Sequence, residues 1–138
     1  MTSLQPGGVE VLDRKYAGTT NTLHAARNDV VSWLREHRID PDLQERTALV
    51  LSELATNAIQ AAPGNAYSMR VSLGDDHSVV VAVTSQSEHD RPTQREHWGP
   101  SNPLAARGRG LLIVSELSDR VEVGQPAPDV VVVTAVLH

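Results

Sequence analysis

The sequence predicts an α/β (α+β) two-layer sandwich, in which a mostly antiparallel mixed sheet has helices packed on one face. Three observations support this fold class. The chain has 138 residues, which suits one domain with a single core. Apolar residues recur at helical spacing in two long segments of the first half. Valine-rich segments bounded by turn residues predict strands that follow one another in pairs.

Composition and charge limit the functions that the chain can have. The formal net charge is −5 and the sequence pI is about 5.6, which argues against direct binding of nucleic acid. There is no Cys, so neither a disulfide frame nor thiolate chemistry is expected. The N-terminus lacks a basic region followed by an apolar run, and no stretch of apolar residues is long enough for a membrane span. We therefore expect a cytoplasmic protein that does not bind membranes.

The first half of the chain predicts one strand and two helices. Residues 1–8 form a flexible tail in this interpretation, and residues 9–17 form an edge strand. Residues 20–38 place apolar side chains on one helical face. A second helix starts at Asp40-Pro41-Asp42, where an acid and a proline occupy the first turn, and it runs to about Ala62.

The second half predicts four strands and a shorter helix. Residues 66–74 and 77–85 form a hairpin around a Gly-Asp-Asp turn. Residues 86–107 hold three prolines and several charges without periodicity, so we expect a functional lid there. The helix follows, and 119–124 and 129–137 are the closing strands. Residues 9–138 are thus expected to be one domain.

Two short motifs carry the candidate chemistry. In SELATNA, Glu53 and Asn57 stand four residues apart, which places both on one face of the second helix beside core positions. In RGRGLLI, Gly108 and Gly110 precede a helix whose N-terminal N–H groups suit a phosphate. Each motif alone also fits a structural role: the first as a polar helix edge, and the second as a tight turn into a helix.

In this order and spacing, the motifs resemble the GHKL, or Bergerat-fold, ATPases shared by DNA gyrase, MutL and histidine kinases. The resemblance is greatest to the small single-domain branch of anti-sigma factors and serine-protein kinases. SELATNA corresponds to the N-box and RGRGLLIV to the glycine box, with a pair of central strands and the lid between them. The resemblance covers the chain from residue 20 onward and implies the Bergerat ATP-binding fold.

The resemblance also implies roles for individual residues. Asn57 would give its side-chain oxygen to the Mg²⁺ that bridges the ATP phosphates. Glu53 would orient, or accept a proton from, a serine or threonine hydroxyl of a partner protein. The phosphates would be held by the glycine box and the N-terminus of a helix starting at Leu111, that is by Gly108, Arg109, Gly110 and Leu111. The implied partners are a sigma factor, its antagonist protein, or both, and the family analogy suggests a homodimer.

One position departs from the family pattern. Where the family ends a central strand with an Asp that accepts a hydrogen bond from adenine, VAVTSQSEHD places Ser85, and Asp90 follows too late to replace it without a shift of strand register. Two functions are therefore open. The chain is an ATP-dependent anti-sigma factor with serine/threonine kinase activity, or it is a nucleotide-independent protein-binding regulator that keeps the fold and has lost ATP. Glu53, Asn57 and the glycine box favour the first, and Ser85 favours the second.

Overall fold

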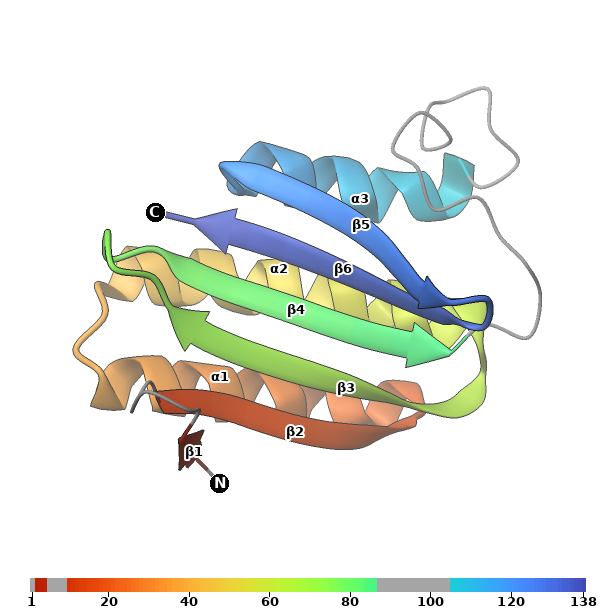
Figure 1. Ribbon diagram of the computed structural model, residues 1–138, viewed down its shortest axis with the longest axis horizontal. Helices are drawn as coiled ribbons and strands as arrows, with labels where there is room; N and C mark the ends of the chain where they lie inside the picture. Colours follow the sequence, from red (N-terminus) through yellow and green to blue (C-terminus); the bar gives the residue numbers. More distant parts are fainter. Residues whose placement is uncertain (1, 5–9, 87–104) are drawn as a thin grey trace.

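The computed structural model describes the backbone of residues 2–4, 10–86 and 105–138 (Figure 1), and the side chains of residues 10–86 and 111–138. Most of the expected lid, including Ser87 and Asp90, lies outside the described residues. The elements follow the expected order: β1 (Thr2–Leu4), β2 (Glu10–Gly18), the short 3₁₀ helix η1 (Thr20–Thr22), α1 (Leu23–Glu36), α2 (Pro41–Ala61), β3 (Gly64–Leu73), β4 (Val79–Gln86), α3 (Ala105–Leu117), β5 (Arg120–Ala127) and β6 (Val130–Leu137).

The strands form one antiparallel sheet, and the helices cover one of its faces. The order of the strands is β1-β2-β3-β4-β6-β5, and each described neighbouring pair is antiparallel. Figure 1 shows the helices behind the sheet, with α1 behind β2 and β3 and with α3 near the β5 edge. The predicted two-layer sandwich with helices on one face is confirmed.

The core lies between the sheet and the helices. In β4, Val79, Val81 and Val83 are buried and alternate with half-buried residues, because successive side chains of a strand point to opposite faces. α2 buries a continuous stripe from Leu43 to Ile59 against this layer. In a chain without Phe, the core is filled mainly by aliphatic side chains, with Tyr67 as its largest fully buried member.

The start of α2 has the predicted chemistry. The Asp40 carboxylate accepts hydrogen bonds from the backbone N–H groups of Asp42, at 3.0 Å, and Leu43, at 3.4 Å, and Pro41 occupies the first helical position. These bonds satisfy donors that the first turn of a helix leaves unpaired. α2 is thereby fixed at the end opposite to Asn57.

The structure corrects two boundaries of the sequence interpretation. The expected tail contains the short strand β1, which pairs with β2. The expectation that the third helix starts at Leu111 is wrong, since α3 starts at Ala105 and includes Gly108, Arg109 and Gly110. Residues 105–107 are strong helix formers, and a glycine costs only about 1 kcal/mol inside a helix, which is too little to stop it there.

None of the helices in the described part of the chain is long and apolar enough to cross a membrane.

Candidate functional site

Glu53 and Asn57 lie on the flank of α2 that faces α3. Residues separated by four, seven and eleven positions share one side of a helix, so Arg46 belongs to the same flank. The Arg46 guanidinium donates a hydrogen bond through Nη2 to the backbone carbonyl of His138, just beyond β6, at 2.7 Å. β6 neighbours β5, and α3 connects directly to β5, so this flank is turned toward α3.

Asn57 is the site residue with an unsatisfied group. Its Nδ2 atom is buried and has no hydrogen-bond partner within the described part of the chain. Leaving a buried donor unpaired costs about 1–3 kcal/mol, so such a group needs a compensating role. Glu53, one turn earlier, is half-buried and forms no ion pair with the described residues. Together they present a polar pair that the described part of the chain does not satisfy.

Ser85 lies at the end of β4 that is near the C-terminal half of α2. It is two residues from the buried Val83 and four from the buried Val81. Because alternate residues of a strand share a face, Ser85 belongs to the helix-covered face of the sheet. Its cross-strand partner in β6 is Val131. This pair offers one neutral hydroxyl and one apolar side chain, and neither can accept a charge-assisted hydrogen bond from a base.

The glycine box lies at the same end of the molecule but within α3. Figure 1 shows the start of α3, the end of β4 and the last turns of α2 at one end of the sandwich. Gly108, Arg109 and Gly110 belong to the second turn of α3, and Leu111 is half-buried against the core. The structure thus brings all the predicted site residues to one end, although the glycines do not precede the helix as expected.

A pair of stacked tyrosines fixes the neighbouring elements, and the sequence interpretation did not identify it. Tyr16 of β2 and Tyr67 of β3 stack with ring centroids 5.5 Å apart. The Tyr16 hydroxyl donates to Asp29 of α1 at 2.5 Å, and the Tyr67 hydroxyl lies 2.9 Å from Thr22 Oγ1. Burial, and then the bond to Asp29, raises the pKa of Tyr16 far above its ordinary value, so the hydroxyl stays a donor. The signal in the sequence is that each of the first two predicted strands carries one tyrosine.

The oxygen atoms of Glu53 and Asn57 suit a magnesium ion that is held mainly by phosphate groups and water. Among the described residues, no group of three or more His, Cys, Asp or Glu side chains converges to hold a metal. Mg²⁺ in phosphate-binding sites usually takes one or two protein oxygens and completes its shell with phosphates and water. The Asn57 side-chain oxygen, next to the Glu53 carboxylate, fits that arrangement, and the unpaired Nδ2 is left to donate to a phosphate oxygen.

Comparisons with known proteins agree with this geometry. The family model described as "Histidine kinase-like ATPase domain" matches residues 16–136. Among solved structures, the fold is similar to that of a chain in the crystal structure of the SiaB-SiaC complex from Pseudomonas aeruginosa. The TM-score is 0.69 at 14% sequence identity, and the match covers 92% of this chain and 89% of the other. No curated protein matches the sequence significantly.

Proposed function

Because the chain belongs to the family of histidine kinase-like ATPase domains, we propose that it is an ATP-binding regulatory protein of the anti-sigma factor type with serine/threonine kinase activity. It controls transcription by binding a sigma factor or the antagonist of that factor. The nucleotide lies between α2 and α3, at the end of the sandwich where β4 ends.

The observation that carries this proposal is the α3-facing flank of α2. Glu53 and Asn57 point to the same side, and Asn57 has a buried amide end without a partner among the described residues. A helix that serves only for packing gains nothing from such a group, because its burial costs free energy. A phosphate oxygen of a bound nucleotide would accept the hydrogen bond that Nδ2 lacks.

Each residue has a distinct task in this function. The Asn57 side-chain oxygen would hold the Mg²⁺ that accompanies the phosphates, and the ion would supply neutralising charge there. Glu53 accepts a hydrogen bond from the serine or threonine hydroxyl of the partner and takes up its proton as the hydroxyl attacks. The second turn of α3 lies beside the phosphates, where glycines leave the backbone accessible.

Partner binding is supported by the fold comparison. The similar solved structure is a complex of two proteins, SiaB and SiaC, so this fold is compatible with a role in protein assembly. The partner proposed for this chain is a sigma factor or its antagonist. The assembly proposed for the chain itself is a homodimer.

A second function is favoured by the Ser85–Val131 pair. A hydrogen bond to a charged group contributes about 1.5–3 kcal/mol, and Ser85 cannot provide one to adenine. If no other group replaces it, the chain binds its partner without a nucleotide. This regulator would use the same fold and would keep Glu53 and Asn57 as half-buried polar residues.

Titration with Mg-ATP by calorimetry separates the two functions. We expect the wild-type protein to bind with a dissociation constant in about the millimolar range, because the loss of a charged acceptor weakens binding roughly ten- to a hundredfold. Ser85→Asp is expected to bind at least about tenfold more tightly, and Asn57→Ala to abolish binding. Absence of binding to both the wild type and Ser85→Asp would support the nucleotide-independent regulator. Micromolar binding by the wild type that Ser85→Asp leaves unchanged would show that another group recognises the base.

A further inference from the structure

The ladder between β3 and β4 ends before either strand ends. Its last pair is Ser68 with Thr84. β3 extends beyond this pair to Gly64, where it pairs with β2, and β4 extends to Gln86, where it pairs with β6. The two strands are therefore drawn apart by their other neighbours. The sheet opens into a wedge, and the strand edges that face each other across it have no ladder partner.

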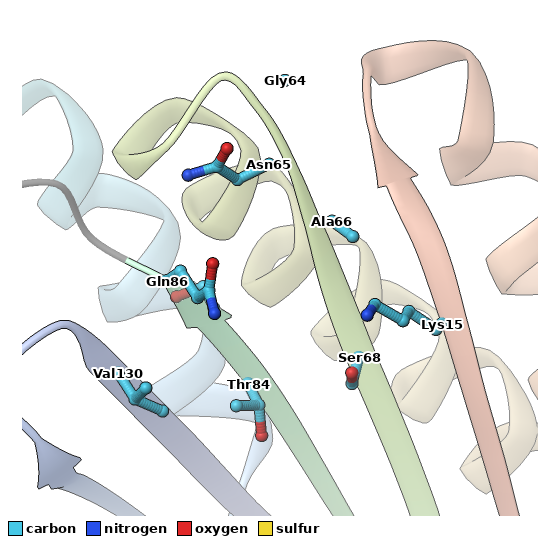
Figure 2. A pocket seen from close by; sticks show the side chains of 9 residues that line it. Lys15, Gly64, Asn65, Ala66, Ser68, Thr84, Gln86 and Val130 are labelled. Carbon is cyan, nitrogen blue, oxygen red and sulfur yellow. The ribbon is translucent and has the colours of Figure 1, made fainter.

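A cavity of about 270 Å³ occupies this wedge. Figure 2 shows that Lys15 reaches from β2 toward β3 beside Ser68, while the amides of Asn65 and Gln86 stand on either side of the opening. Ser68 and Thr84 alternate with buried residues of their strands, so their hydroxyls belong to the sheet face away from the helices. The cavity thus reaches the open face of the sheet, and it is also lined by Ser85, which belongs to the opposite face.

The polar side chains around the cavity have no partner among the described residues. No side-chain hydrogen bond or ion pair with the rest of the described chain is made by Lys15, Asn65, Ser68, Thr84 or Gln86. Other cations on the same face are paired within the protein. Arg70 lies 3.0 Å from Asp13, and Arg120 lies 3.3 Å from Glu122.

The chemistry of the lining is that of an anion site. The ammonium group, both amides and the hydroxyls of Ser68, Thr84 and Ser85 can donate hydrogen bonds, and none of the described lining residues carries a carboxylate. A volume of about 270 Å³ lies below the roughly 300–1,000 Å³ of pockets that take drug-sized ligands.

We propose that this wedge is a second binding site, which takes a small oxyanion, either a carboxylate or a phosphate. Lys15 supplies the charge, and the amides and hydroxyls bind the oxygens. The cavity shares Ser85 with the proposed nucleotide site, whose Glu53 and Asn57 lie on the helix side of the sheet and do not line the cavity.

The proposal is tested by nuclear magnetic resonance titration of the ¹⁵N-labelled protein without nucleotide. Sodium phosphate and sodium acetate are added in separate series, each against sodium chloride at matched ionic strength. We expect saturable shifts centred on Ser68, Thr84 and Gln86. The series that saturates at lower concentration identifies phosphate or carboxylate as the preferred group.

Three variants make the test specific. Lys15→Gln is expected to weaken anion binding at least about fivefold, because it removes the charge-assisted bond. Gln86→Glu is expected to abolish binding, since it places a like charge beside the anion. Arg70→Gln removes a cation from the same sheet face outside the cavity, and it is expected to change the affinity less than twofold.

Two outcomes would overturn the proposal. One is the absence of saturable shifts in both anion series. The other is an equal effect of Lys15→Gln and Arg70→Gln, which would show general attraction of anions to the surface. Neither outcome bears on the proposed function, which is tested by Asn57→Ala and Mg-ATP.

Discussion

At the scale of single residues, replacing Asn57 is expected to affect ligand binding and folding stability in opposite directions. Its buried Nδ2 has no partner among the described residues, which costs about 1–3 kcal/mol. Ala is also a better helix former than Asn by several tenths of a kcal/mol. We therefore expect Asn57→Ala to lose Mg-ATP binding while its free energy of unfolding without ligand rises by about 1 kcal/mol. Urea unfolding measures the second quantity.

Thr56→Ala is the matched control for Asn57→Ala. Thr56 lies on the same turn, and its hydroxyl donates to the Ser52 carbonyl at 2.7 Å instead of facing the site. The control is expected to keep its affinity for Mg-ATP. If Asn57→Ala lowered the free energy of unfolding by more than about 1 kcal/mol, the amide would have a structural role.

Glu53 is expected to act in the chemical step alone. General base catalysis contributes about 10²–10⁴-fold to a rate. Glu53→Gln keeps the shape of the side chain and removes the base, so transfer of phosphate from ATP to the antagonist protein should fall by at least about a hundredfold. Binding of Mg-ATP and of the antagonist should change less than about threefold. An equal loss of binding and transfer would contradict this role.

The residues of α2 could be predicted from the sequence because helical spacing alone places Glu53 and Asn57 on one face. Ser85 could be placed because the parity of the valines in β4 fixes which side chains face the helices. The wedge beside Lys15 could not be predicted. Its existence depends on where the β3–β4 ladder stops, and that is decided by pairing with β2 and β6 rather than by local sequence.

At the scale of elements, Gly18 of β2 pairs with Gly64 of β3 where the two backbones approach each other closely. A Cβ atom at this position would lie 2.1 Å from the Asn65 carbonyl oxygen, which belongs to the rigid backbone. We expect Gly18→Ala to lower the free energy of unfolding by about 2–4 kcal/mol, because the two strands must move apart. Thermal unfolding in a calorimeter measures the change.

Gly124 in β5 is the matched control for this substitution. A Cβ atom there would meet nothing within 4 Å. Replacing a glycine without a clash reduces the entropy of the unfolded chain and stabilises by about 0.4–1 kcal/mol. Gly124→Ala should therefore be neutral or slightly stabilising. Similar losses for both variants would mean that the contact with Asn65 relaxes easily.

The elements differ in how well their boundaries could be predicted. The start of α2 was evident because Asp40 and Pro41 act locally on the first turn. The start of α3 was misjudged because the two glycines suggested a turn, whereas the flanking alanines and arginines carry the helix through them. The start of a helix can be predicted where capping residues act on its first turn. It is harder to predict whether a helix continues through a glycine, because that depends on the helix propensity of the neighbouring residues.

At the scale of the whole molecule, two histidines hold distant parts of the chain together. His37 at the end of α1 lies with Nε2 2.5 Å from the Glu10 carboxylate of β2. His138 lies between two carboxylates, with Nε2 2.7 Å from Asp76 after β3 and with Nδ1 hydrogen-bonded to Asp119 before β5. Each ring therefore links segments that are far apart in the sequence.

The protonated form of both rings is favoured by folding. Burial lowers the pKa of His37, but the bonds to the Trp33 carbonyl and to Glu10 outweigh it, so the net shift is upward from 6.5. The bonds to Asp76 and then to Asp119 raise the pKa of His138 above 6.5. The bonds from Ser78 and then from His138 lower the pKa of Asp76 below its ordinary 3.8.

These shifts predict that the protein is most stable in mildly acidic solution. A raised histidine pKa contributes stability that is fully present below 6.5 and is lost as the pH rises through the folded-state value. The lowered pKa of Asp76 contributes stability that is present above 3.8 and is lost as the pH falls. We expect the free energy of unfolding in urea to be greatest between these limits and to fall as the pH rises above 6.5. Glu10→Gln and Asp119→Asn should each flatten the fall on the alkaline side, because each removes a carboxylate that favours one protonated ring. A profile that keeps its full alkaline slope in the double variant would assign the dependence to other groups.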